Sequence, residues 1–127
     1  MPYLIIASAG KKGRGIFTTK NIKANTIIEV APVIVLSAKE RKTIEETKLF
    51  HYVFEWGRSK KQACIALGYA SLYNHNYSSN CEYDMDYDKR TITIKTVKTI
   101  KKGDELSINY NAEPNDTTPV WFDAEDD

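Results

Sequence analysis

The chain has 127 residues, 18 of them Lys or Arg and 17 Asp or Glu, which gives a formal net charge of +1. This length fits one domain, and a net charge so near zero argues against recruitment of nucleic acid or anionic lipid by the field of the whole protein. The apolar runs are too short to span a bilayer, the N-terminus lacks a signal-peptide pattern, and two cysteines make neither a disulfide framework nor a zinc site, so we expect a cytoplasmic protein without a metal or a membrane partner.

The hydrophobic pattern predicts short strands along most of the chain, separated by glycine-bearing turns. In chain order, strands are expected at residues 3–7, 16–19, 26–30, 33–36, 50–56, 63–67, 81–83, 91–97 and 105–110. Ser37, with Glu40 three residues later, forms a capping-box pattern that predicts a solvated helix running towards Lys48. Residues 74–80 are expected to form an ordered loop. Many short strands with little helix predict a mostly β fold of several small sheets.

Two short polar or glycine-rich features stand out from this pattern. Gly13-Arg14-Gly15 lets the backbone approach a ligand closely, although such a triplet is most often a plain turn, and it lacks the third glycine and following helix of a dinucleotide fingerprint. Asn74-His75 offers an amide that both donates and accepts hydrogen bonds. An isolated Asn-His pair is more often part of a satisfied loop, and no ligand spacing supports His75 as a metal ligand.

The third feature is the segment from Gly103 to Tyr110. In strand geometry Leu106, Ile108 and Tyr110 share one face. Taken by itself, the segment reads as a half-buried strand whose tyrosine hydroxyl meets a backbone carbonyl.

In this order the three features resemble the SET domain, a family of lysine methyltransferases that use S-adenosylmethionine. The matching stretches are residues 12–17, 71–76 and 103–106 with Tyr110, and the likeness covers nearly all of residues 10–111. The resemblance implies a SET domain over residues 1–112 and a C-terminal segment, 113–127, that closes over the cofactor site. It also implies small β-sheets around a C-terminal pseudoknot, in which the strand that ends near Tyr110 passes through a loop made by the Asn-His segment. True knots are rare, so such threading would serve to bring distant residues together.

The resemblance further implies a role for each matching residue. The backbone of Gly13, Arg14 and Gly15 would hold S-adenosylmethionine, with Asn74 at its amino-acid end and the backbone of His75 at its adenine. Tyr110 would stand at the point of methyl transfer. Aromatic walls suit a lysine stem, and the candidates for the wall of the lysine channel are Tyr69, Tyr73 and Tyr52 or Phe54, each of which could equally be a core residue. The ring of Trp121 could stack on the adenine, or the tail that carries it could simply dock.

Such a site is expected to act mainly by aligning the methyl donor with the lysine amine. A free lysine has a pKa of about 10.4, so the substrate amine must lose a proton, which a desolvated channel beside a positive sulfonium favours. Orientation alone can then lower the barrier by about 7–11 kcal/mol. The partner is a protein that bears the target lysine.

Some positions depart from the family pattern. Asn76 replaces the usual Ser, Ser79 replaces a frequent Pro, and Ala112 stands where an aromatic residue is common, which leaves the number of methyl groups added open. Asn76 and Ala112 motivate an alternative function, a catalytically silent SET-like interaction module. A nucleic-acid binder is the weakest alternative because such binding depends on phosphate neutralisation. The sequence identifies neither the substrate protein nor whether the chain forms a homodimer.

Overall fold

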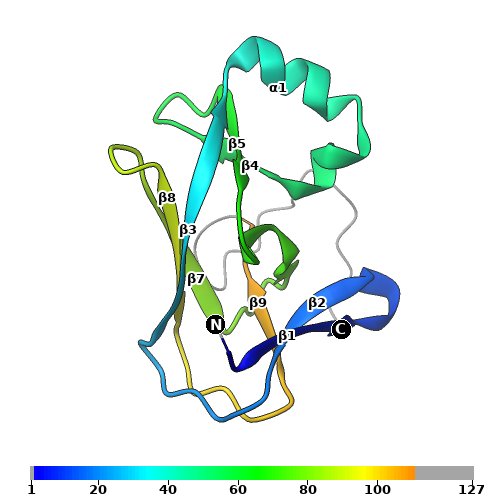
Figure 1. Ribbon diagram of the computed structural model, residues 1–127, viewed down its shortest axis with the longest axis vertical. Coiled ribbons are helices and arrows are strands. Elements are labelled where there is room, and N and C mark those ends of the chain that lie inside the picture. Colours follow the sequence, from blue (N-terminus) through cyan, green and yellow to red (C-terminus); the bar gives the residue numbers. More distant parts are fainter. Residues whose placement is uncertain (1, 111–127) are drawn as a thin grey trace.

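The computed structural model describes residues 2–110, whose strands form two sheets with one α-helix at one end (Figure 1). The strands are β1 Leu4–Ser8, β2 Arg14–Thr18, β3 Ile27–Leu36, β4 Val53–Trp56, β5 Gln62–Ala66, β6 Asn74–His75, β7 Cys81–Asp86, β8 Thr91–Thr96 and β9 Glu105–Ile108. The α-helix is α1 Ala38–Glu45, and three 3-10 helices span Gly10–Lys12, Lys48–Tyr52 and Ala70–Leu72. The predicted mostly β fold of several small sheets is confirmed.

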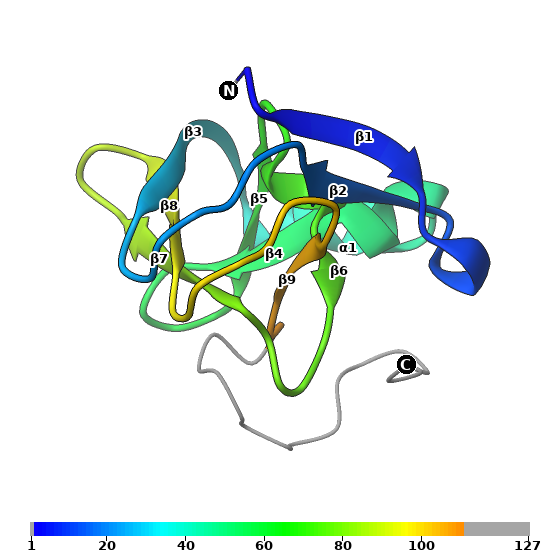
Figure 2. The same ribbon diagram turned by 90° about the horizontal axis from the view of Figure 1, so that it is seen from below.

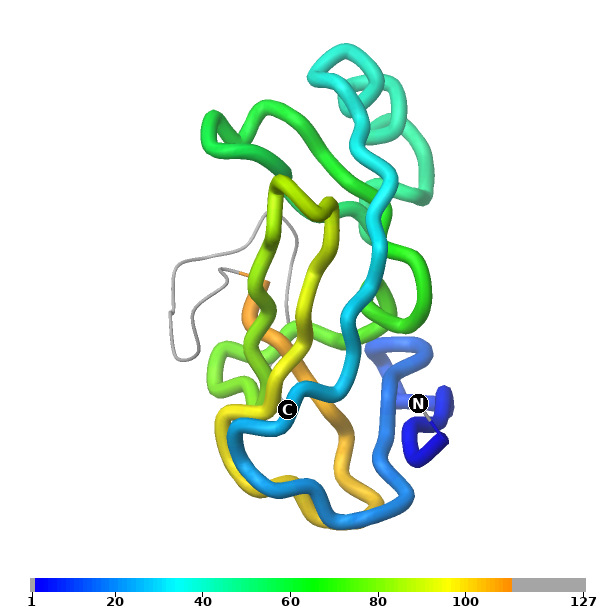
Figure 3. Tube along the Cα trace, turned by 60° about the vertical axis from the view of Figure 1, so that its left-hand side comes forward, coloured from blue at the N-terminus to red at the C-terminus, as the bar shows by residue number. Residues whose placement is uncertain are grey.

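The larger sheet has five antiparallel strands in the order β4-β5-β3-β8-β7. Its β7–β8 hairpin, expected from the alternating pattern, lies beside β3 in Figure 3. The two strands expected at 26–30 and 33–36 are one continuous strand, β3. Pro32 stays in the ladder because its carbonyl accepts the N–H of Leu67 at 2.9 Å, so only its own donor is missing.

The smaller sheet has four strands in the order β1-β2-β9-β6, and β6 pairs with β9 in parallel (Figure 2). Residues 74–80 contact β9 along its length: the N–H of Asn76 donates to the carbonyl of Ile108 at 3.0 Å. The amide of Asn80 reaches the other end, where Nδ2 donates to the carbonyl of Glu105 at 2.9 Å and Oδ1 accepts from the N–H of Ser107 at 2.8 Å. The chain therefore wraps around β9 where the sequence predicted an ordered loop.

Residues 50–56 do not form the single strand that their alternation predicts. Lys48–Tyr52 is a 3-10 helix, begun by Thr47, whose side chain accepts the N–H of Leu49 at 3.2 Å. Only Val53–Trp56 is a strand. Phe54 and Trp56 point into the core, whereas Tyr52 is 40% exposed. A local side-chain hydrogen bond thus overrides the strand pattern.

The predicted capping box of α1 is confirmed. The Oγ of Ser37 accepts the N–H of Glu40 at 3.1 Å, and the N–H of Ser37 donates to Oε1 of Glu40 at 2.9 Å. The helix ends at Glu45 after eight residues, and no helix in the described part of the chain has the length and apolar character to cross a membrane.

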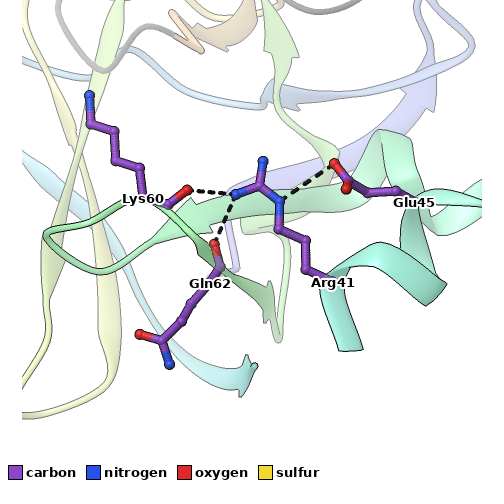
Figure 4. A network of polar contacts seen from close by, with 4 residues as sticks. All are labelled: Arg41, Glu45, Lys60 and Gln62. Carbon is purple, nitrogen blue, oxygen red and sulfur yellow. Dashed lines mark hydrogen bonds and ion pairs between the residues drawn. The ribbon is translucent and has the colours of Figure 1, made fainter. Parts of the chain in front are cut away.

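Arg41 fixes α1 to the turn between β4 and β5 (Figure 4). One guanidinium nitrogen donates to the carbonyls of Lys60, at 2.7 Å, and Gln62, at 3.2 Å, while Nε pairs with Glu45 at 3.4 Å. These bonds satisfy backbone carbonyls of the turn, so the helix is held at the end of the five-stranded sheet.

The core lies between the two sheets. It contains side chains from both, including Ile16 and Leu106 of the smaller sheet and Ile92 and Ile94 of the larger, all with no exposed surface. Burial of an aliphatic side chain of this size contributes about 2 kcal/mol. The packed core thereby sets how the two sheets sit relative to each other and fixes the strands that carry the site.

Candidate active site

A cavity of about 370 Å³ lies where the smaller sheet meets the 3-10 helices. Its lining comes from four separate parts of the chain: Lys12, Gly13 and Arg14; His51 and Tyr52; Ser71, Leu72 and Asn74; and Tyr110. The structure therefore brings together Gly13, Arg14, Asn74 and Tyr110, which the sequence placed in one site.

Gly13 and Gly15 are required near this cavity for different reasons. Gly13 has φ 82°, in the left-handed region that side chains rarely adopt, and a Cβ there would meet nothing within 4 Å. Gly15 is buried, and a Cβ there would lie 2.5 Å from Oε2 of Glu105 and 2.8 Å from Nδ2 of Asn74. The first glycine allows the turn, and the second allows three segments to touch.

Asn74 joins those segments through its amide. Its Nδ2 donates to the carbonyl of Arg14 at 3.1 Å and to Oε2 of Glu105 at 2.7 Å. The strand alternation of β6 turns Asn74 towards the cavity and sends its neighbours Tyr73 and His75 into the interior. The amide oxygen is left to accept from a ligand.

Tyr110 is held at three points. Its hydroxyl donates to the carbonyl of Tyr73 at 3.1 Å, its N–H donates to Nδ1 of His75 at 3.0 Å, and its carbonyl accepts from the hydroxyl of Tyr83 at 3.1 Å. Burial, with smaller effects of Tyr52 and Glu105, raises the pKa of Tyr110 to about 12. The phenol is therefore neutral at physiological pH and fixed in the cavity wall.

A second, smaller hollow meets the first beside Tyr110. It is lined by His51, Tyr52, Val53, Phe54, Ser71 and Tyr110. Four of these residues also line the larger cavity, so Tyr110 stands on the boundary between the cavity that contains Lys12, Arg14 and Asn74 and a hollow with aromatic and aliphatic walls.

The residues expected in a lysine channel have different positions. Tyr52 lines both hollows, and Phe54 lines the smaller one. Tyr69 and Tyr73 line neither of these two. Tyr73 is only 1% exposed, and its hydroxyl donates to Oε1 of Glu29 at 3.0 Å. Of the two positions that the sequence left open for Tyr73, channel wall or core, its ring has the core position, because β6 alternation directs Asn74 to the cavity.

The side chain of His75 has a role that the sequence did not predict. Its buried ring contacts the rings of Tyr77 and Tyr110, with centroids 4.3 and 5.1 Å away, and its Nδ1 accepts the N–H of Tyr110. The expectation that its backbone holds an adenine stays a prediction. Trp121, Ala112 and the segment 113–127 lie outside the described residues.

Sequence reasoning also missed Tyr83 and Glu105. Tyr83 contacts the ring of Phe54, with centroids 5.3 Å apart, and supports the carbonyl of Tyr110. Burial raises the pKa of Tyr83, so it too is a neutral donor. The alternation of the predicted 81–83 strand could have indicated that Tyr83 faces inward. Nothing in the sequence indicates the bond between Glu105 and Asn74.

Within residues 2–110, no three His, Cys, Asp or Glu side chains are grouped so that they could hold a metal ion. Both cysteines are buried free thiols, and burial raises the pKa of Cys64 and of Cys81 to about 12. They are therefore protonated and act as small apolar core residues.

Comparison with known proteins adds four findings. The family model of the SET domain matches residues 13–111. A Schizosaccharomyces pombe protein named histone-lysine N-methyltransferase, H3 lysine-37 specific, is 32% identical over 123 residues, which cover 96% of this chain and 78% of that protein. The Halocynthia roretzi histone-lysine N-methyltransferase SETD7 is 35% identical over 72 residues, covering 49% of this chain and 18% of that protein. A crystal structure of a Plasmodium falciparum protein, described as a candidate histone methyltransferase, has a TM-score of 0.65 and 28% identity, and the match covers 85% of this chain and 92% of that one.

Proposed function

Since the chain belongs to the SET domain family, we propose that it transfers a methyl group from S-adenosylmethionine to the side-chain amine of a lysine in a protein. The observation that carries this proposal is the position of Tyr110, on the boundary between the larger cavity and the smaller, aromatic hollow. A methyl donor in one compartment and an amine in the other would meet at its hydroxyl.

The larger cavity fits the amino-acid end of the proposed cofactor. Its volume, about 370 Å³, lies in the range of small-molecule sites. Oδ1 of Asn74 suits an ammonium group, and the cationic side chains of Lys12 and Arg14 suit a carboxylate. The close approach at Gly15 keeps these groups together, since any side chain there would push Asn74 away.

The smaller hollow has walls that suit the stem of a lysine, and because its volume is only about 10 Å³, about the space of one water, it must widen to admit that stem. Tyr52, Val53 and Phe54 provide apolar and aromatic walls, which exclude water and tolerate a cationic amine above a ring. Such desolvation lowers the pKa of the bound lysine and so favours the neutral amine that reacts.

When bound, S-adenosylmethionine supplies an electrophilic methyl group, and the lysine nitrogen forms a bond to that carbon as the sulfur–carbon bond breaks. Tyr110 orients the amine: its hydroxyl donates to the carbonyl of Tyr73, and its oxygen would accept a hydrogen bond from the substrate N–H. Because the pKa of Tyr110 is raised to about 12, the phenol does not act as a base at neutral pH. The surplus proton leaves to water.

The names of the relatives make histones the first substrates to test. The purified chain is incubated with methyl-tritiated S-adenosylmethionine and core histones, and separately with a mixture of total cell proteins, and cofactor binding is measured by calorimetry. We expect binding and labelled lysine. Tyr110→Phe should retain binding and lose about hundredfold in turnover, whereas Tyr87→Phe, in the β7–β8 turn and outside both hollows, should match the wild type.

Absence of both binding and transfer would contradict the proposal. Binding without transfer to any protein in the mixture would favour the catalytically silent interaction module. Unchanged turnover in Tyr110→Phe would remove Tyr110 from the mechanism while leaving the reaction in place.

A further inference from the structure

Glu29 is a buried carboxylate outside both hollows. It lies on the inward face of β3, opposite Ile94, where the β3–β8 register shifts between Ile27 and Glu29. Only 6% of its surface is exposed. Removing a carboxylate from water costs free energy unless hydrogen bonds to its oxygens offset that cost. The groups that bind Glu29 are therefore the ones that make its burial possible.

Both oxygens of Glu29 bind the segment that enters β6. Oε2 accepts the backbone N–H of Tyr69 at 2.8 Å, and Oε1 accepts the hydroxyl of Tyr73 at 3.0 Å. Burial raises the pKa of Glu29, and these two bonds act in the opposite direction because they favour the ionised form.

The turn before β6 is shaped around this carboxylate. Gly68 has φ 80°, and a Cβ at Gly68 would lie 2.5 Å from Oε2 of Glu29. The turn therefore leaves space for the carboxylate, which in turn holds both ends of the segment 69–73.

Tyr73 connects this carboxylate to the reacting group. Its side-chain hydroxyl is fixed by Glu29, and its backbone carbonyl accepts the hydroxyl of Tyr110 at 3.1 Å. A short chain of hydrogen bonds thus runs from β3 to Tyr110, although Glu29 itself lines neither hollow.

We propose that Glu29 is a positioning residue for methyl transfer: by anchoring Tyr73 it fixes the carbonyl that orients the Tyr110 hydroxyl. This inference rests on the proposed function. The support for it is that Glu29 binds the residue whose carbonyl accepts from the Tyr110 hydroxyl.

The first test is Tyr73→Phe, which removes the bond to Glu29 and keeps the ring. We expect kcat to fall about five- to tenfold, the effect of one hydrogen bond, with the cofactor Kd and the substrate KM unchanged. In a Tyr110→Phe background the same substitution should have no further effect on kcat, because the hydroxyl that it misplaces is already gone.

The second test is the pair Glu29→Gln and Glu29→Ala. The glutamine oxygen can still accept the Tyr69 N–H while its NH₂ donates to the Tyr73 hydroxyl, so kcat should stay within about threefold of the wild type. Glu29→Ala should lower kcat at least as much as Tyr73→Phe. An equal fall in kcat for Tyr73→Phe in the wild-type and the Tyr110→Phe backgrounds would overturn the inference and leave the proposed function standing. So would an unchanged kcat in Tyr73→Phe.

A measurement without turnover separates the two proposals. With ¹³Cζ-tyrosine labelling, the Tyr110 signal is assigned from its loss in Tyr110→Phe. We expect Tyr73→Phe and Glu29→Ala to shift this signal and Tyr87→Phe to leave it in place. An inactive wild type with these shifts would refute methyl transfer but keep the positioning of Tyr110 by Glu29, whereas an unshifted signal would refute the positioning.

Discussion

The two sheets of this protein differ in how many of their strand pairs join neighbouring segments of the chain. In the five-stranded sheet, β4–β5 and β7–β8 are hairpins whose strands follow each other in the chain. In the four-stranded sheet, β9 lies between β2, near the other end of the described chain, and the parallel strand β6. The larger sheet has a hairpin at each edge, and its long-range pairs all involve β3. In the smaller sheet only β1–β2 is a hairpin, and both partners of β9 are distant in the chain; this sheet carries Gly15, Asn74 and the strand that leads to Tyr110.

This difference has a physical consequence. Contacts between distant segments must be made all at once, so a substitution at one of them disturbs both the fold and the site. Substitutions of similar size in the two edge hairpins of the five-stranded sheet should stay local.

Gly15→Ala should have the largest effect. The added Cβ must displace the Glu105 carboxylate or the Asn74 amide, and a displacement of about 1 Å in a site costs about hundredfold. We expect the Kd for S-adenosylmethionine, measured by calorimetry, to rise by about that factor. Gly57→Ala, in the β4–β5 turn at φ 88°, is the matched control: it should lower stability by about 1 kcal/mol and leave binding unchanged. Wild-type binding by Gly15→Ala would mean that this close approach does not shape the cavity.

Asn80→Ala should lower the free energy of unfolding by about 2–3 kcal/mol, measured in urea. It removes two hydrogen bonds to β9 and leaves the Ser107 N–H and the Glu105 carbonyl without their partner. Thr93→Ala, on the outer face of β8, should cost about 0.5 kcal/mol or less. Equal losses at the two positions would argue against the special dependence of the smaller sheet on its long-range contacts.

Alkaline pH should gradually lower the free energy of unfolding through two thiols of the five-stranded sheet. Burial raises the pKa of Cys64 and Cys81 from 9.0 to about 12, so above pH 9 the unfolded chain loses protons that the folded chain keeps. Stability should therefore be constant below pH 8 and fall above pH 9 by about 1 kcal/mol per pH unit for each thiol. Replacing both cysteines with Ala should flatten the curve between pH 9 and 10, and a curve of unchanged slope would show that the thiols are not responsible.

Lys95→Ala should have the smallest effect. Lys95 pairs with Glu82 across β7 and β8 at 3.5 Å, and both side chains are more than a third exposed. Water and salt screen such a pair, so we expect a loss of about 0.5 kcal/mol or less, further reduced in 1 M salt. A loss above 1 kcal/mol would show that the five-stranded sheet also depends on its surface charges.

The same contrast explains what the sequence revealed. The 81–97 hairpin and the Ser37 capping box depend on neighbouring residues and were predicted correctly. The 3-10 helix at Lys48–Tyr52 was missed because the Thr47 side-chain bond competes with a strong alternating pattern.

Pairing between distant residues is not visible in local patterns. Glu29 and Tyr73 are 44 positions apart, and no periodicity links them. The motif resemblance placed Asn74 and Tyr110 in one site, but the core position of Tyr73 and the support from Tyr83 depend on strand faces that only the assembled sheets define.

The most direct test of the central claim is a crystal structure of the chain with S-adenosylhomocysteine. The ligand should fill the cavity between Gly13 and Asn74, with its sulfur directed towards the Tyr110 hydroxyl and the smaller hollow beyond it. A ligand bound elsewhere, or a sulfur pointing away from Tyr110, would contradict the claim.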